Sequence, residues 1–200
     1  MSATTVRTRL TGDERRLVVL REAGRLFARS GYAGTTLDDV AAAAGVTKPM
    51  VYRHFESKKA LYLALLAKHE NDLPTFFERL DPATLAGPPE TLVRAVLDVW
   101  FDYVAENQHA WVMLFRDASG DEEIREFRLR VSASARRVMA AFVGAQAGPG
   151  LAAEEVEPAA ELIRAGLAGL ALWWIDNPQV EKTLLVDVAA RMYAPAILRS

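Results

Sequence analysis

Apolar residues recur at helical spacing along nearly the whole chain. In the first such segment, over about residues 13–29, Val19, Ala23 and Phe27 follow one another every four residues, which places them on one face of an α-helix. Gly31 follows the segment, and glycine commonly ends helices. The sequence has no sustained alternation of apolar and polar residues and no Asn-Gly or Asp-Gly hairpin signal. The pattern predicts an all-α fold.

Capping residues divide the N-terminal part into short helices. Thr36 and Asp39 have the spacing of a capping box, in which a hydroxyl and a carboxylate three residues apart bond each other's backbone amides. The helix that they begin is expected to end at Gly45, which suits a left-handed cap. Thr47 can cap the next helix, with Pro49 in its first turn.

A proline- and glycine-containing stretch separates this part from the rest of the chain. It covers residues 81–89 and is the best linker in the sequence. Ser57 is expected to cap the helix that precedes this linker, and Asn177-Pro178 is expected to cap the last helix. Further helices are predicted over residues 90–107, 110–118, 121–146 and 153–176. The predicted organisation is an N-terminal domain over 1–57, a linking helix over 58–80 and a C-terminal helical domain over 81–200.

The two short N-terminal helices have the internal spacing of a helix-turn-helix. Ala41, four residues before Gly45, has a side chain small enough for the two helices to cross closely. Val51, six residues after the glycine, can fill the crossing from the second helix. A small core is completed by Leu37, Val40, Ala44 and Phe55. The spacing predicts a helix-turn-helix, although a pair of alanine-rich helices shows parts of it by chance.

Charge is divided unevenly along the chain. Residues 1–68 hold 12 Lys and Arg against 6 Asp and Glu, whereas residues 69–200 hold 12 against 20. Lys48, Lys58 and Lys59 lie in first helical turns, where the helix dipole disfavours cations unless an anion docks there. A polyanion-binding N-terminal surface is predicted. The alternative is a solvated surface whose charges differ by accident.

An ordered set of residues spans this region: Gly31-Tyr32, Thr35-Thr36, Val40-Ala41, Ala44-Gly45-Val46-Thr47-Lys48, Val51-Tyr52-Arg53-His54-Phe55 and Lys58. The set resembles the DNA-binding domain of the tetracycline-repressor (TetR) family. The resemblance covers about residues 15–65, and the rest of the chain matches only in length and helical pattern. Gly24 and Met50 depart from the family's usual residues.

The resemblance implies roles for individual residues. Lys48 to Phe55 would form the recognition helix, which enters the major groove of DNA. The positions matching phosphate contacts are Thr36, Thr47, Lys48, Tyr52, His54 and Lys58. The candidates for base contact are Pro49, Met50 and Arg53, and the arginine can bond guanine O6 and N7. The ring of Tyr52 has packing within the domain as its alternative role.

Aromatic residues crowd two consecutive helices in the C-terminal part. Trp100, Tyr103, Trp111 and Phe115 are candidates to line an apolar effector cavity, with Arg116 as a polar group. Aromatics at helical spacing also form ordinary cores, and that alternative stays open. If Arg116 is buried, it requires an anionic partner, either an effector carboxylate or a nearby acid.

The last two predicted helices carry apolar stripes. The segment from Ala165 to Ile175 is apolar on almost every side, which indicates burial all round. The TetR resemblance implies a four-helix interface between two copies of the chain. The candidate residues for it are Leu167, Leu170, Trp174, Leu184 and Val188. The alternative is a core within one chain.

Composition and motifs exclude several classes of protein. The chain has no cysteine and three histidines, so neither a metal site nor a cofactor is expected. Hydrolase, nucleotide-binding and metalloprotease motifs are absent from the sequence, and an enzyme is not expected. The longest uncharged apolar run has 11 residues, against the roughly 20 that a membrane span needs. With no signal peptide recognised, a cytoplasmic location is expected.

The sequence therefore predicts a transcriptional regulator. It would be a repressor that leaves a near-palindromic operator when a small molecule binds. The expected partners are double-stranded operator DNA, a second copy of the chain and an effector of unknown identity, without a membrane. The alternative is an all-helical adaptor that binds proteins and has no specific affinity for DNA.

Overall fold

The structure is a computed structural model that describes residues 11–72, 76–116, 120–146 and 151–197. These residues form ten α-helices, two short 3-10 helices and no strand, which confirms the all-α prediction. The α-helices are α1 (Gly12–Ser30), α2 (Leu37–Ala44), α3 (Lys48–His54), α4 (Lys58–Asp72), α5 (Pro82–Leu85), α6 (Pro89–Glu106), α7 (Gln108–Phe115), α8 (Glu122–Gln146), α9 (Val156–Asp176) and α10 (Lys182–Ile197). The 3-10 helices are η1 (Phe76–Arg79) and η2 (Ala153–Glu155).

Local capping determines where the N-terminal helices begin and end. The capping box of Thr36 and Asp39 is present, with the Asp39 amide 3.2 Å from Thr36 Oγ1 and the Thr36 amide 2.9 Å from Asp39 Oδ2. Gly45 ends α2 with φ 64° and ψ 31°, the left-handed conformation that favours glycine. Ser57 Oγ accepts a bond from the Ala60 amide at 3.0 Å. These predictions are confirmed.

The helix expected over residues 58–80 is shorter than predicted. It ends at Asp72, and η1 precedes Leu80. The linker expected over residues 81–89 contains α5, because Asp81 Oδ1 accepts a bond of 2.7 Å from the Ala83 amide and so begins a helical turn.

The last helix begins later than expected. Asn177 and Pro178 do not cap it; they lie in a turn, and α10 begins at Lys182. The Trp174 indole donates to the Val180 carbonyl at 2.9 Å, and the Val180 amide donates to the Asn177 carbonyl at 3.0 Å. These tertiary and turn bonds hold the segment out of the helix.

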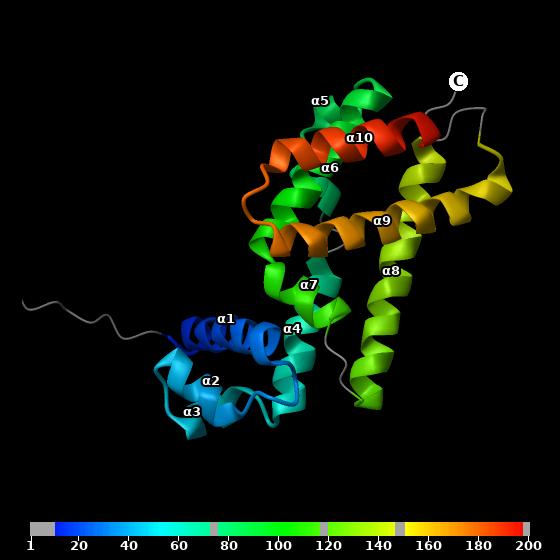
Figure 1. Ribbon diagram of the computed structural model, residues 1–200. Helices are drawn as coiled ribbons and strands as arrows, with labels where there is room; N and C mark the ends of the chain where they lie inside the picture. Colours follow the sequence, from blue (N-terminus) through cyan, green and yellow to red (C-terminus); the bar gives the residue numbers. More distant parts are fainter. Residues whose placement is uncertain (1–10, 73–75, 117–119, 147–150, 198–200) are drawn as a thin grey trace, which may run out of the picture.

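The helices are arranged as two packed groups that share α7 and α8 (Figure 1). Helices α1–α3 form one end of the molecule, and α4 leads from them toward the remaining helices. At the other end, α10 packs against α6, and α9 packs against α8. Among the described helices, none is long and apolar enough to cross a membrane.

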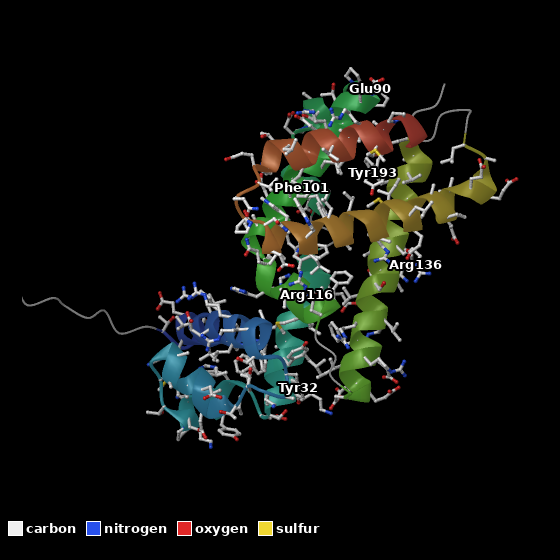
Figure 2. All side chains as sticks on the ribbon, viewed as in Figure 1. Tyr32, Glu90, Phe101, Arg116, Arg136 and Tyr193 are labelled. Atoms are coloured by element: carbon white, nitrogen blue, oxygen red, sulfur yellow. The ribbon has the colours of Figure 1, made fainter. Side chains whose placement is uncertain are left out.

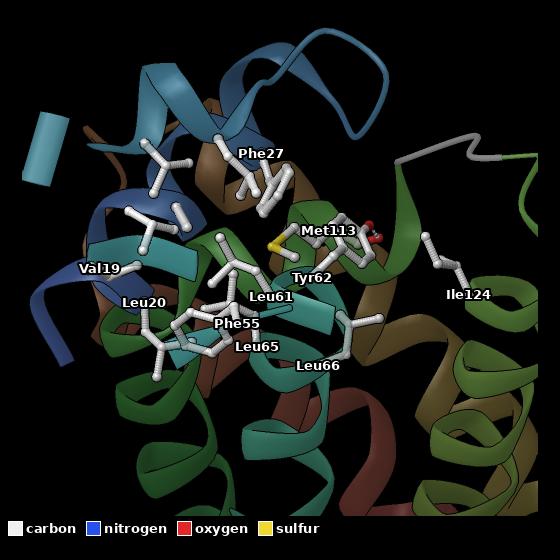
Figure 3. Packing of buried hydrophobic residues seen from close by; sticks show 14 of the residues in the cluster. Val19, Leu20, Phe27, Phe55, Leu61, Tyr62, Leu65, Leu66, Met113 and Ile124 are labelled. Carbon is white, nitrogen blue, oxygen red and sulfur yellow. Dashed lines mark hydrogen bonds between the residues drawn. The ribbon is translucent and has the colours of Figure 1, made fainter. Parts of the chain in front are cut away.

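The buried core of the N-terminal end extends well beyond residue 57. It joins Val19, Phe27 and Val51 of α1 and α3 to Tyr62 of α4 and Met113 of α7 (Figure 3). The Tyr62 hydroxyl donates to the Met113 carbonyl at 3.2 Å. The start of α4 is therefore part of the N-terminal core, which also rests directly on α7.

A glycine within α1 offers a test of this contact. A Cβ atom added at Gly24 would lie 3.7 Å from both His109 Cβ and Leu65 Cδ2, which is ordinary van der Waals contact. Because alanine is favoured over glycine inside a helix by about 1 kcal/mol, we expect Gly24→Ala to raise the free energy of unfolding by up to that amount. Urea denaturation checks this. Gly12→Ala, at the first residue of α1, is the control and should change stability less. A lower stability of Gly24→Ala would contradict the described packing of α1 on α7.

Candidate DNA interface and effector cavity

The helix-turn-helix is built around a closely packed crossing of α2 and α3. Val40 and Val51 are fully buried, and Ala41 is nearly so. The Val46 amide donates to the Ala41 carbonyl at 3.0 Å, which closes the turn after Gly45. Burial of one side of α3 leaves its other side to solvent.

Most of the predicted DNA contacts lie on that solvent side. Thr36, Thr47, Lys48, Pro49, Tyr52 and Arg53 are exposed, and Met50, His54 and Lys58 are partly buried. Tyr52 has 46% of its surface exposed, so its ring is not simply core packing. Thr47 stands at the N-cap of α3 but makes no side-chain cap bond, contrary to the predicted cap.

Lys48 is paired within the chain. Its Nζ lies 2.9 Å from Asp38 Oδ2 on α2, and both side chains are about half exposed or more. The hydrogen bond and charge of Asp38 raise the pKa of Lys48. A carboxylate thus already pairs with the lysine that is predicted to contact a DNA phosphate, and such a contact would have to displace or share this pairing.

Removing that carboxylate should strengthen DNA binding. Because exposed ion pairs are weak, we expect Asp38→Asn to raise affinity for any duplex by about two- to fivefold. Fluorescence anisotropy at fixed salt measures this. Asp13→Asn, which removes the same charge from α1, is the matched control. An equal gain in both variants would show that net charge, and not the pairing with Lys48, limits binding.

Lys58 has a structural role that its sequence position did not reveal. Its Nζ donates to the carbonyls of Tyr32 and Thr35 at 2.7 and 2.9 Å and lies 4.4 Å from the centre of the Tyr32 ring. The lysine therefore holds the turn between α1 and α2 against the start of α4. Contact between Lys58 and a DNA phosphate stays a prediction. The ammonium group that would make this contact already donates to two backbone carbonyls.

An apolar cavity of about 130 Å³ lies among α6, α7, α8 and α9. Four of the five predicted effector residues line it, namely Trp100, Tyr103, Trp111 and Phe115. The Trp111 and Phe115 rings stack with centroids 5.4 Å apart. The other lining residues are Val96, Leu97, Ala135, Val138, Met139, Phe142, Arg164, Leu167 and Ala168. The aromatic residues therefore surround a hollow as well as pack the core.

Arg116 is not among the residues that line this cavity, and its contact with an effector stays a prediction. It follows the last residue of α7, and its side chain is 39% exposed (Figure 2). Its guanidinium bonds the carboxylate of Asp176 and the Leu172 carbonyl at the C-terminal end of α9. An acid distant in sequence is its partner, which periodicity alone could not reveal.

Arg164 is the cavity cation that sequence reasoning missed. It lies on α9 with its side chain 17% exposed, and it bonds Glu161 through Nε at 2.8 Å. The available signal was a single arginine at the start of an apolar stretch that runs to Ile175.

The residues predicted to form a dimer interface divide into two groups. Leu184 and Val188 are exposed on α10. Leu167, however, is buried, and Trp174 and Leu170 pack against the same internal core. The exposed side of α9 instead presents Leu162, Ala165, Gly166, Gly169 and Trp173. Within the single chain the two sides of α9 differ in burial, because only one faces the chain's own core. Burial of the other side by a second copy stays a prediction.

Models of two regulatory-protein domains match the chain. Residues 19–65 match the bacterial regulatory proteins of the tetR family, and residues 89–193 match the tetracyclin repressor-like C-terminal domain. The second match alone covers more than half of the 200 residues.

Individual relatives agree with these matches. The transcriptional activator FasR of Mycolicibacterium smegmatis is 29% identical over 90% of this chain and 81% of its own length. The negative regulator IcaR of Staphylococcus aureus is 25% identical over 52% of this chain and 54% of its own length. The solved structure of FadR from Bacillus subtilis, in complex with stearoyl-CoA, has a TM-score of 0.68 at 16% identity and covers 88% of this chain and 96% of that one.

Proposed function

This chain belongs to the tetR family of bacterial regulatory proteins, and from that membership we propose that it is a dimeric repressor released from its operator by a small molecule. DNA binding through a helix-turn-helix and regulation of transcription are properties of the family. The direction of regulation, the symmetry of the site and the effector are the new parts of the proposal.

The exposed side of α3 is the observation that carries DNA binding. Tyr52 and Arg53 project from a helix of seven residues whose opposite side is anchored by Val51. Arg53 can make the paired hydrogen bonds that identify guanine in the major groove. Phosphate contacts from the surrounding polar residues would position the helix, whereas base contacts would specify the sequence.

Dimerisation is supported by an uncharged apolar surface on α9 and α10. On α9, no residue of the exposed set from Leu162 to Trp173 is charged. On α10, Leu184, Val188 and Met192 are 53%, 38% and 69% exposed. Two copies related by a two-fold axis would cover this surface and place two α3 helices on successive half-sites of a near-palindrome.

Release is supported by the position of α4. This helix begins in the N-terminal core, and its residue His69 bonds the Tyr103 hydroxyl at 2.8 Å through Nδ1. Tyr103 lines the effector cavity. A ligand that binds better to one position of α4 than to another would shift the population of the two α3 helices toward a spacing that no longer fits DNA.

Selection of binding sites from random duplex DNA at about 50 and 200 mM salt tests the proposal. One near-palindromic motif, bound less tightly at higher salt, is the expected result. A reporter promoter carrying that motif should lose activity when the protein is present, and a gain would make the protein an activator. Failure to enrich a motif with refolded, ligand-stripped protein would contradict specific DNA binding and favour a protein-binding adaptor.

A further inference from the structure

A second cavity, of about 320 Å³, adjoins the apolar one. The two share Tyr103, Trp111, Phe115, Ala135 and Arg164 in their walls. The two cavities are therefore adjacent. We define the first as the inner cavity and the second as the outer cavity.

The two cavities differ in the chemistry of their walls. Arg125, Arg128 and Arg164 all line the outer cavity, and none of its described lining residues is Asp or Glu. In the inner cavity, Arg164 is the only charged residue among those that line it. Arg164 thus belongs to the walls of both the cationic outer cavity and the apolar inner one.

Helix α8 orders this change along a single face. Arg125, Arg128 and Ser132 line the outer cavity, and Val138 and Phe142 line the inner one. With Ala135, which lines both cavities, successive residues of this set are three or four positions apart, the spacing of neighbours on one side of a helix. Phe142 lies fourteen positions after Arg128, a rise of about 21 Å.

Arg125 of the outer cavity is available to an anionic ligand. Arg125 pairs with Glu122 through Nε at 2.9 Å, but the two side chains are 57% and 65% exposed. Exposed pairs of this kind contribute little free energy, so the guanidinium can turn to a ligand. Guanidinium groups bind phosphate and carboxylate oxygens with two parallel hydrogen bonds.

We infer that the effector is an elongated amphipathic anion, with an apolar body in the inner cavity and a phosphate-bearing head at Arg125 and Arg128. Arg164 contacts the ligand where its polar and apolar parts meet. The inference rests on the proposed effector site and assigns its chemical class and orientation. A purely apolar molecule would fill the inner cavity but leave the arginines of the outer cavity without a ligand anion.

Three probes that share one twelve-carbon chain test this assignment: dodecyl phosphate, dodecanoate and dodecanol, all below their aggregation limits. Isothermal titration calorimetry of the full chain should give the tightest binding for the phosphate and the weakest for the alcohol, with at least tenfold between these two. In Arg125→Gln/Arg128→Gln, we expect the preference for phosphate over alcohol to fall to about threefold or less, while dodecanol binds as before. Arg137→Gln, an exposed arginine of α8 that lines neither cavity, is the matched control and should keep the full preference.

Three results would overturn the inference. These are equal binding of phosphate and alcohol, a preference that survives the double substitution, and no binding of any probe by a protein whose thermal unfolding is intact. The titrations contain no DNA. A selected operator motif without head-group preference would therefore reject only this inference, whereas head-group preference without a motif would reject only the proposed repressor.

Discussion

Replacing Leu184 and Val188 with aspartate is expected to convert the protein to a monomer and to lower its affinity for the selected operator by about a hundredfold or more. The two side chains are 53% and 38% exposed on α10, in the surface that we assign to a second copy. Charges buried there without partners would oppose association. A monomer would then bind each half-site separately. In a dimer, binding of one subunit holds the other close to the second half-site, and a monomer lacks this gain in affinity.

Sedimentation velocity measures the oligomeric state, and fluorescence anisotropy with one whole operator measures affinity. Leu85→Asp is the control, because Leu85 is 47% exposed but lies on α5. It should leave the protein dimeric and its DNA binding unchanged. A dimer that persists in the double variant, with full operator affinity, would show that α10 is not part of the interface.

Arg53→Ala should produce the second large effect. Loss of a paired contact to guanine costs about 1–3 kcal/mol per half-site, so affinity for the operator should fall by roughly 5- to 150-fold for each half-site. The loss should be largest for the selected sequence and small for random duplex. In the Arg53→Ala variant, the preference for one base pair over the others should disappear at one position of each half-site.

Binding to the operator and to the three variants at that base pair, measured at one salt concentration, checks this expectation. Arg137→Ala removes the same charge from exposed α8 and should leave discrimination intact. If Arg53→Ala weakens all duplexes equally, Arg53 contacts phosphate and another residue of α3 reads the bases.

Much of the N-terminal end was predictable from sequence because its signals are local. The capping box at Thr36, the left-handed turn at Gly45 and the buried Val51 all follow from interactions within about fifteen residues. Helical periodicity similarly predicted most of the C-terminal helices to within three residues. Short-range hydrogen bonds and burial of one face determine such features wherever the segment lies.

The roles of charged residues depended on partners far along the chain. Arg116 and Arg164 both adjoin apolar runs, yet Arg164 lines the inner and outer cavities, whereas Arg116 lines neither and bonds Asp176 at the end of α9. Lys58 likewise reaches carbonyls more than twenty residues away. No pattern within a single helix distinguishes these arrangements.

By itself the sequence determined the all-α fold and the helix-turn-helix with its cationic second helix, since backbone hydrogen bonding, capping and periodic burial are encoded locally. Only the tertiary structure decided which side of α9 is exposed, with Leu162 outward and Leu167 inward. It also decided that the aromatic residues line a cavity and that Arg125 and Arg128 line the one beside it. A helix with apolar residues on nearly every side can bury any of its sides. Which side is buried depends on the free energy of packing against helices that are distant in the chain.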